Sequence, residues 1–348
     1  MTDDQGHELT STLPAEKNLD NHSAGSRQPG QVVDLEEARS FLRRRYAGGA
    51  TDIAELGGGD WSRAFSFCLD GTALVARFGQ YREDYLRDEW AMSIAGPDLP
   101  VPRVLEVGDA FDGAYAISEL HAGRFLETLD EPALRLLLPA LLRALDALRL
   151  VPLPTYAGCR WCTDGLTDGT SWRDWLLAAL VDNPGDRVGG WRATLAASAE
   201  LDHLFVEGER ALRALLGACP ELRHVLHLDL LNRNVLVADD GWSFEAIFDW
   251  GCTTYGDFLY EIAWFTFWAP WHRGLAAVDF RGEILRHYAA IDLDVPNFDE
   301  RLRCYEVHIG LTHLAYCAFA GGETDLLAVA RRLQEVLELP LPPQPPAR

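Results

Sequence analysis

Two aspartates and an asparagine in the second half of the chain have the side chains and spacing for phosphoryl transfer. Asn234 follows Asp229 by five residues, and Asp249 follows Asn234 by fifteen. Phosphoryl transfer uses metal ions that bridge phosphate oxygens, and carboxylate and amide oxygens are ligands that suit Mg²⁺. The other carboxylate can orient an acceptor hydroxyl and take its proton. The three side chains therefore predict a phosphoryl-transfer site, provided that the fold brings them together.

A β-hairpin between Asn234 and Asp249 would meet that condition. Apolar residues occupy positions 235–237 and all but one of positions 244–248, and most of the residues between these runs are polar or glycine. Two such strands joined by a turn bring the chain back to its starting point, so we expect Asp249 beside the loop that holds Asp229. We also expect a short strand over residues 225–226, paired with residues 235–237.

The residues before position 119 predict a small antiparallel sheet with one crossing helix. Asp34 and Glu37 have the spacing of a capping box at the start of a first helix, which we expect to run to residue 46. Asp70 followed by Gly71 is a hairpin signal. Strands are predicted over residues 53–56, 63–69, 73–78, 104–107 and 114–118, and the crossing helix over residues 82–95.

Beyond residue 124 the chain becomes rich in Leu, Ala, Arg and Trp at helical spacing. Helices are predicted over residues 132–148, 171–180, 201–216, 257–268, 280–288, 299–320 and 324–337. The fold class is therefore α+β, with two lobes. We expect an N-lobe over 32–118, a hinge over 119–123 and a larger, mainly helical C-lobe over 124–338.

The charge of the chain excludes several function classes. Lys and Arg number 31 against 53 Asp and Glu, a net charge of −22. This charge disfavours nucleic acid and anionic membranes as partners and favours a cationic ligand. The only lysine is Lys17, in the polar N-terminal stretch. A Walker A loop and a Schiff-base enzyme both need a lysine in the folded part, so both are excluded.

The ends of the chain predict little regular structure. Residues 1–31 are polar and read as a disordered tail, and residues 339–348 are rich in proline. With no signal-peptide pattern and no long apolar run, we expect a cytoplasmic protein, and we expect it to be a monomer. Cys159 and Cys162 form a lone CxxC pair, for which an incidental pair is favoured over a zinc or redox site.

The motif His227-x-Asp229-x₄-Asn234, followed by Asp249-Trp250-Gly251, resembles the aminoglycoside and choline kinase-like phosphotransferases, which share the protein-kinase fold. Within that family the chain most resembles the hygromycin B phosphotransferases of the 4-O type. The similarity covers about residues 52–320. The matching segments are residues 61–67, 170–174, 219–224 and 255–271.

The resemblance implies ATP and Mg²⁺ as cofactors and assigns a role to each matching residue. Asp229 is similar to the catalytic aspartate that positions and deprotonates the acceptor hydroxyl, and Asn234 and Asp249 resemble the two Mg²⁺ ligands. The turn after Gly57 resembles a phosphate-covering loop, and the hinge resembles the backbone segment that binds adenine. The cofactor-binding residues implied are Gly58, Gly59, Ser62, Arg77, Glu89, Glu119, Leu120 and His121.

The chain departs from the family pattern at two places. Arg77 stands where the family usually has a lysine, and the resemblance to the hygromycin phosphotransferases implies an arginine at this position. The guanidinium of Arg77 can bind phosphate oxygens bidentately and pair with a glutamate of the crossing helix. Glu89 is the first candidate for that pairing and Glu83 the second. In the catalytic loop, Leu228 replaces the usual glycine, and Asn232-Arg233 replaces the usual proline or glycine before Asn234.

The acceptor is the least specified part of the prediction. Its candidate residues are Asp229, Asn232, Glu261, Trp264 and Trp268. By resemblance the acceptor is the 4-hydroxyl of hygromycin B, so the expected function is inactivation of a cationic antibiotic. Other aminoglycosides, a macrolide, choline or homoserine are alternatives within the same fold. A nucleotide-binding protein without catalytic activity is an alternative of a different class.

Overall fold

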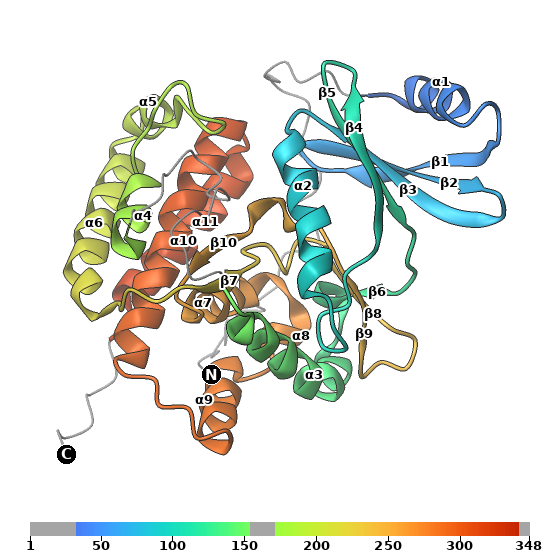
Figure 1. Ribbon diagram of the computed structural model, residues 1–348. Coiled ribbons are helices and arrows are strands. Elements are labelled where there is room, and N and C mark those ends of the chain that lie inside the picture. Colours follow the sequence, from blue (N-terminus) through green and yellow to red (C-terminus); the bar gives the residue numbers. More distant parts are fainter. Residues whose placement is uncertain (1–32, 154–170, 341–348) are drawn as a thin grey trace, which may run out of the picture.

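The computed structural model describes residues 33–153 and 171–340, which form a sheet-containing N-lobe and a larger helical C-lobe (Figure 1). The predicted N-terminal tail, nearly all of the proline-rich C-terminal segment and the Cys159–Cys162 pair lie outside the described residues. The zinc or redox alternative for that pair is therefore untested.

Five antiparallel strands form the sheet of the N-lobe in the spatial order β1-β2-β3-β5-β4. The strands are β1 (Ala50–Gly58), β2 (Ser62–Leu69), β3 (Thr72–Gly79), β4 (Val104–Ala110) and β5 (Gly113–Glu119). This confirms the predicted sheet. Asp70 and Gly71 both have positive φ, 52° and 80°, and they connect paired residues Leu69 and Thr72 in a two-residue hairpin.

Two helices accompany this sheet. Helix α1 (Leu35–Arg45) begins with the predicted capping box between Asp34 and Glu37. Helix α2 (Arg82–Ala91) lies on the side of the sheet that faces the C-lobe (Figure 1). It is shorter than predicted, because residues Met92–Ile94 tighten into a 3-10 turn. Helix α2 also contacts the 3-10 turn Trp250–Cys252 of the C-lobe, so it bridges the two lobes.

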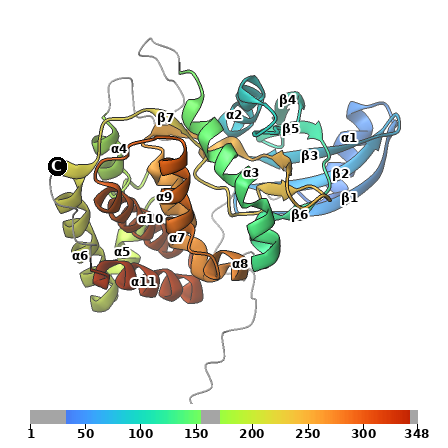
Figure 2. The same ribbon diagram turned by 90° about the horizontal axis from the view of Figure 1, so that it is seen from below.

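The C-lobe is built mainly from helices, and all seven predicted helices are present. They are α3 (Glu131–Leu150), α4 (Trp172–Ala178), α6 (Ala199–Leu215), α7 (Leu259–Trp268), α9 (Phe280–Ala290), α10 (Phe298–Ala320) and α11 (Glu323–Glu338). Two short helices, α5 (Trp191–Ala196) and α8 (Arg273–Ala276), were not predicted, because so few residues show no helical periodicity. Figure 2 shows α3 running between the other helices and the N-lobe.

Two small sheets carry the predicted catalytic loop. Strand β7 (His224–Leu226) pairs with β10 (Thr254–Gly256), and β8 (Val235–Val237) pairs with β6 (Arg124–Phe125) and with β9 (Phe244–Ile247). The predicted hairpin between Asn234 and Asp249 is therefore confirmed. The predicted pairing of residues 225–226 with 235–237 is wrong, because β7 pairs with β10 instead. Strand β10 follows the β8–β9 hairpin, and apolar spacing along the chain does not indicate such a distant partner.

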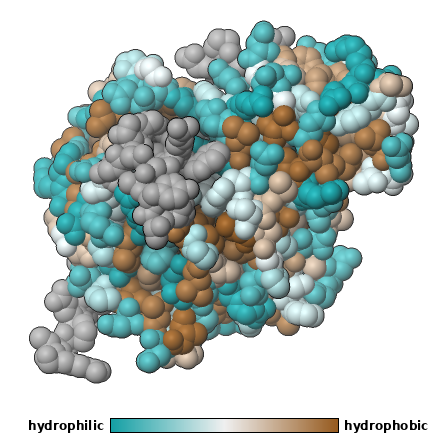
Figure 3. Space-filling model, viewed as in Figure 1, coloured by the Kyte–Doolittle hydropathy of each residue, from teal (hydrophilic) through white to brown (hydrophobic). Residues whose placement is uncertain are grey.

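Each lobe has a hydrophobic core of its own. Phe65, Phe67 and Phe78 form the centre of the N-lobe core, and the larger C-lobe core surrounds α7 and α10. On the face shown in Figure 3, hydrophobic residues gather over the N-lobe sheet, and hydrophilic residues are spread over much of the C-lobe. Within the described ranges, no helix is long and apolar enough to cross a membrane.

A buried ion pair joins the start of α7 to α10. The Asp257 carboxylate accepts hydrogen bonds from Arg301 Nη2 at 2.6 Å and Nε at 2.8 Å, and from the Tyr305 hydroxyl at 2.6 Å. Asp257 Oδ1 also accepts a hydrogen bond from the Leu259 amide, in the first turn of α7, at 3.2 Å. Helix α7 lies beneath the catalytic loop, so this ion pair holds in place the helix on which the loop rests.

Replacing Arg301 with alanine should destabilise the protein strongly. The Asp257 and Arg301 side chains are 0% and 2% exposed, so the variant leaves a buried carboxylate without its charged partner. We expect the free energy of unfolding to fall by about 3–5 kcal/mol. Urea denaturation followed by circular dichroism measures it. Arg210→Ala, on the exposed surface of α6, is the matched control and should change it by less than about 0.5 kcal/mol.

Candidate active site

The structure brings the three predicted polar residues together at the junction of the lobes. Asn234 Nδ2 donates to the Asp229 side chain at 3.0 Å and to the Asp229 carbonyl at 2.8 Å. The Phe248 amide donates to the Asn234 carbonyl at 3.0 Å, which holds Asp249 beside the same loop. Asn232 lies at the edge of the group, with Nδ2 at 3.3 Å from Asp229 Oδ2.

Arg77 reaches this group from strand β3 of the N-lobe. Its Nη1 lies 3.2 Å from Asp249 Oδ1, and its Nη2 donates to the carboxylate of Asp88 on α2. Arg77 thus faces two carboxylates, one from each lobe. A guanidinium in this place can bind phosphate oxygens bidentately.

The predicted partners of Arg77, Glu89 and Glu83, are both wrong. Both lie on the exposed side of α2, whereas Asp88 is 4% exposed. The physical reason is the helical period. Tyr85, Asp88 and Ala91 lie three residues apart and share the buried face, so the residue that meets Arg77 is selected by its face rather than by its side-chain length.

Asp88 has a second role that the sequence analysis missed. Its Oδ1 accepts a hydrogen bond from the Trp250 amide at 2.8 Å. The neighbouring Arg87 donates to the Gly251 carbonyl and is 3% exposed. Helix α2 therefore holds the backbone immediately after Asp249 and positions that carboxylate. The sequence offered one indication of this role. Arg87 and Asp88 are adjacent charged residues in a helix whose polar and apolar residues are not separated onto opposite faces.

His227 braces the catalytic loop from inside. The residue is fully buried, its Nε2 donates to the Phe248 carbonyl at 3.1 Å, and its ring lies 4.6 Å from the ring of Trp250. Burial lowers the pKa of His227 to about 4, so the ring is neutral near pH 7. Its burial and its bond to the Phe248 carbonyl make it a structural residue of this loop.

Glu261 supports the backbone of the catalytic loop, and the prediction that it faces the acceptor is wrong. It is 2% exposed, and its Oε1 accepts a hydrogen bond from the Leu228 amide at 2.9 Å. Leu228 has φ of 66°, in the left-handed region that a branched side chain rarely adopts. This is the position where the resemblance led us to expect glycine, and the bond from Glu261 helps to hold it there.

The electrostatics of the site favour Asp229 as a proton acceptor. Burial and the nearby carboxylate of Asp249 raise the pKa of Asp229 well above its ordinary value, and the amides of Asn232 and Asn234 only partly oppose this. A carboxylate with a raised pKa takes a proton from a hydroxyl more readily than an ordinary surface aspartate does.

The donor set fits a hard divalent cation. The Asn234 amide nitrogen faces Asp229, which leaves Oδ1 as the ligand atom, and the Asp249 side chain is 45% exposed beside it. Oxygen donors of this kind suit Mg²⁺, which takes its remaining ligands from water and phosphate oxygens. Among the described residues, no group of three or more His, Cys, Asp or Glu side chains is arranged to hold a metal ion.

The predicted phosphate-covering segment is the turn between β1 and β2. Strand β1 extends through Gly58, so only Gly59, Asp60 and Trp61 form the turn, and Ser62 begins β2. A Cβ at Gly58 would lie 2.5 Å from the Ser62 carbonyl oxygen, which requires glycine there. A Cβ at Gly59 would meet nothing within 4 Å, so the outer side of this turn is open. Its contact with phosphate stays a prediction.

Two backbone amides of the hinge already donate hydrogen bonds within the N-lobe. The amide of Glu119 donates to the Arg103 carbonyl at 3.1 Å, and the amide of Leu120 donates to the Ala73 carbonyl at 3.3 Å. Both amides are thus engaged, so an adenine would be bound by the carbonyls of this segment or by the amide of His121. The His121 side chain points to the C-lobe hairpin, with Nδ1 at 2.8 Å from Glu245.

Trp264 and Trp268 lie one turn apart on α7 and are 7% and 9% exposed. Their rings lie 5.2 and 4.8 Å from the ring of His313 on α10. The indole nitrogens of both tryptophans are buried without a hydrogen-bond partner, which is costly unless a ligand or water accepts from them. Their contact with an acceptor stays a prediction.

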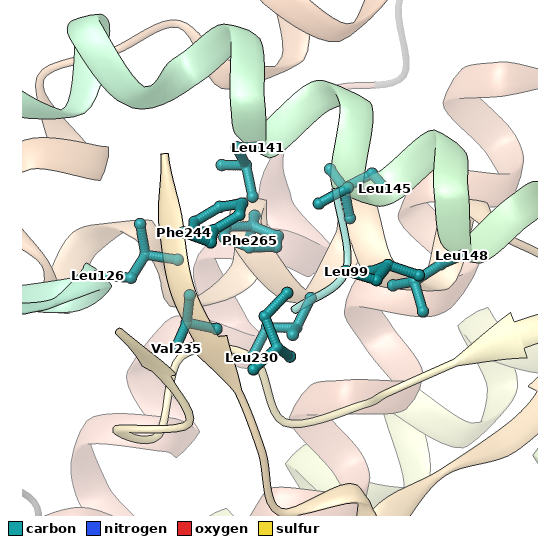
Figure 4. Close-up of a pocket in the computed structure, with 11 residues that line it drawn as sticks. Leu99, Leu126, Leu141, Leu145, Leu148, Leu230, Val235, Phe244 and Phe265 are labelled. Carbon is teal, nitrogen blue, oxygen red and sulfur yellow. The ribbon is translucent and has the colours of Figure 1, made fainter. Parts of the chain in front are cut away.

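The catalytic loop is anchored by apolar side chains on its inner side. Figure 4 shows Leu230 and Val235 pointing, with leucines of α3 and Phe265 of α7, into a small cavity. The cavity offers about 10 Å³ to a water molecule and is entirely apolar, so it is a packing defect rather than a ligand site. Leu230 therefore ties the loop that carries Asp229 to the C-lobe core.

Asp88→Asn should weaken ATP binding, and Glu89→Gln should not. Asparagine can still accept from the Trp250 amide, but it lacks the charge that holds the Arg77 guanidinium. Because a hydrogen bond to a charged group contributes about 1.5–3 kcal/mol, we expect a loss of about tenfold or more. Calorimetric titration with an ATP analogue measures it. Equal losses in the two variants would contradict the pairing.

Glu261 should make the protein less stable as the pH rises. Burial raises the pKa of Glu261 from 4.5 to about 7, so between these values the unfolded chain releases a proton that the folded chain keeps. Relative to Glu261→Gln, the wild-type free energy of unfolding should fall by about 3 kcal/mol between pH 4 and pH 8. Urea denaturation of both proteins across this range measures the difference, and a constant difference would contradict the assignment.

Comparisons with known proteins agree with this geometry. Residues 70–296 match the family model APH, described as the phosphotransferase enzyme family. The hygromycin-B 4-O-kinase of Escherichia coli is 31% identical over 290 residues, which cover 81% of this chain and 79% of that protein.

Solved structures confirm the predicted α+β, protein-kinase-like fold. A thermostable mutant of the aminoglycoside phosphotransferase APH(4)-Ia, in a ternary complex with AMP-PNP and hygromycin B, has a TM-score of 0.72 at 27% identity and covers 86% of this chain and 97% of its own. The spectinomycin phosphotransferase APH(9)-Ia has a TM-score of 0.56 at 13% identity, covers 89% of this chain and 98% of its own, and shows the fold alone. The chain belongs to the APH phosphotransferase enzyme family and is an enzyme that transfers a phosphoryl group to an alcohol.

Proposed function

We propose that this protein transfers the γ-phosphoryl group of ATP to a hydroxyl of an aminoglycoside-type antibiotic, and that the acceptor is the 4-hydroxyl of hygromycin B. The observation that carries the proposal is the group formed by Asp229, Asn234, Asp249 and Arg77 at the junction of the lobes. The similarity to a hygromycin-B 4-O-kinase supports the choice of acceptor.

The phosphates of ATP would lie between the β1–β2 turn and this group. Arg77 binds phosphate oxygens, which displaces Asp249 from its guanidinium and frees that carboxylate for a metal ion. Asn234 Oδ1 and the Asp249 carboxylate would hold Mg²⁺, which supplies positive charge between the phosphates. The placement of Arg77 between Asp88 and Asp249 orients it before the nucleotide arrives.

Asp229 accepts the proton of the acceptor hydroxyl. As that oxygen forms its bond to the γ-phosphorus, the bond from the γ-phosphorus to the oxygen of ADP breaks, and the proton moves to the Asp229 carboxylate. No covalent intermediate on the protein is needed. Asn234 and Asn232 donate to Asp229, so they fix the direction in which it faces the acceptor.

The charge of the protein suits a cationic acceptor. The net charge is −22, and an acidic surface raises the local concentration of an aminoglycoside through its ammonium groups. Asn232 is exposed beside Asp229, where its side chain can contact a hydroxyl-bearing ring.

Asp229→Asn should lower kcat for phosphoryl transfer by about 10²–10⁴-fold, because asparagine retains the shape of the loop but cannot take the proton. A coupled assay of ADP release measures this with ATP, Mg²⁺ and hygromycin B. Near-wild-type turnover by Asp229→Asn would contradict the mechanism.

The same assay separates the proposed acceptor from the alternatives. Kanamycin, a macrolide, choline and homoserine replace hygromycin B in parallel reactions. ADP release with only one of these compounds would support phosphoryl transfer but would contradict hygromycin B as the acceptor. ATP binding without transfer to any member would favour an acceptor outside this panel or a protein without catalytic activity.

A further inference from the structure

The tip of the β1–β2 turn rests on helix α10 of the C-lobe. The ring of Trp61 stacks on that of Phe319, with centroids 6.2 Å apart and planes 7° from parallel, and lies 6.4 Å from the ring of Tyr316. The Tyr316 hydroxyl donates to the carboxylate of Asp60. The turn is therefore held to the opposite lobe by both an aromatic and a polar contact.

Arg187, from the loop between α4 and α5, closes this contact. Its guanidinium carbon lies 4.3 Å from the ring centre of Trp61 and 4.0 Å from that of Tyr81. Its two terminal nitrogens lie 3.1 and 2.8 Å from the two carboxylate oxygens of Asp84, at the start of α2. We call this set the Arg187 clasp; its members are Asp60, Trp61, Tyr81, Asp84, Arg187, Tyr316 and Phe319.

The loop that carries Arg187 is itself fixed to the C-lobe. The Asp182 carboxylate accepts hydrogen bonds from the amides of Gly190 and Arg192, the latter at 2.8 Å. Asn183 Nδ2 donates to Asp186 at 3.0 Å. These bonds close the loop on both sides of Arg187, so its side chain is presented from a defined backbone.

The clasp also touches the backbone of the active site. A Cβ on Gly251 would lie 3.1 Å from the Cβ of Asp84, so the clasp carboxylate packs against the loop that follows Asp249. The same N-lobe elements that the clasp holds, the β1–β2 turn and the start of α2, therefore flank the proposed phosphate site.

The composition of the clasp makes it stronger than a surface ion pair. The Arg187 and Asp84 side chains are 26% and 17% exposed, and the guanidinium is covered by two aromatic faces. Arginine suits this position because its flat fork stacks on rings while it pairs bidentately with a carboxylate. Lysine carries the same charge but can do neither.

We propose that Arg187 is a positioning residue that holds the β1–β2 turn closed over the nucleotide. The inference rests on the proposed function in one respect, that this turn covers the phosphates of ATP. While the clasp is intact, the turn and α2 stay against the C-lobe, and a bound nucleotide cannot leave without parting these contacts. Loss of the Arg187 side chain frees the turn and speeds the release of the nucleotide.

The test compares Arg187→Ala and Arg187→Lys with Arg210→Ala, a matched control in which an exposed arginine of α6 is removed. Hydrogen exchange of the amides over residues 57–62, measured without nucleotide, reports the opening of the turn. Stopped-flow displacement of a fluorescent ATP analogue in the presence of Mg²⁺ reports its dissociation rate. We expect Arg187→Ala to exchange at least about tenfold faster over the turn and to release the nucleotide about tenfold faster.

Arg187→Lys should exchange and release the nucleotide nearly as fast as Arg187→Ala, because lysine keeps the charge but lacks the flat guanidinium that stacks on the rings and pairs bidentately with Asp84. Unchanged exchange and unchanged dissociation in Arg187→Ala would overturn the proposal, as would full restoration by lysine. If Arg187→Ala does not fold, Tyr316→Phe removes a single hydroxyl from the same clasp, and it should also speed exchange over the turn. Unaltered exchange in that variant would count against the clasp.

The two readouts separate this inference from the proposed function. The exchange measurement needs neither ATP nor an acceptor, so it tests the clasp even if hygromycin B is not phosphorylated. Faster exchange in a variant of a protein that binds no ATP would show that the Arg187 clasp holds the turn. It would contradict the claim that the turn covers a nucleotide, and so would overturn the proposal.

Discussion

The carboxylate of Asp88 joins the parts of the active site that come from different lobes. One of its oxygens holds Arg77 of the N-lobe sheet, and the other accepts the Trp250 amide in the loop that follows Asp249. Burying a carboxylate costs folding free energy unless its oxygens are paired. Both partners of Asp88 must therefore stay within hydrogen-bond distance, which fixes the positions of strand β3, helix α2 and this loop relative to one another. The Arg77 guanidinium, proposed to bind phosphate, and the proposed metal ligand Asp249 are thereby placed relative to each other.

The catalytic loop depends on backbone that the chain would not adopt by itself. Leu228, Arg233 and Asp249 all have positive φ, at 66°, 57° and 61°, although none is glycine. Such conformations persist only where the surroundings over-determine them. Glu261 supplies this support beneath Leu228, and His227 supplies it by binding the Phe248 carbonyl.

Much of this arrangement could be predicted from the sequence, because spacing determines what lies near what along the chain. Asp229, Asn234 and Asp249 were predictable as one group since a short hairpin connects them, and the order of N-lobe elements followed from apolar runs and turn residues. The partner of strand β7 was not, because it lies beyond that hairpin. The partner of Arg77 was mispredicted because side-chain type was weighed above helix face. Arg187 gave no signal, since its contacts with Trp61 and Tyr81 connect segments far apart in the sequence.

The central claim is that Arg77, Asn234 and Asp249 together receive the phosphates and the metal ion of ATP. A crystal structure with a non-hydrolysable ATP analogue, Mg²⁺ and hygromycin B tests it most directly. The account predicts Mg²⁺ on Asn234 Oδ1 and the Asp249 carboxylate, Arg77 on phosphate oxygens and still paired with Asp88, and an antibiotic hydroxyl beside Asp229. A nucleotide bound away from this junction, or an Arg77 that remains paired with Asp249 in the complex, would contradict it.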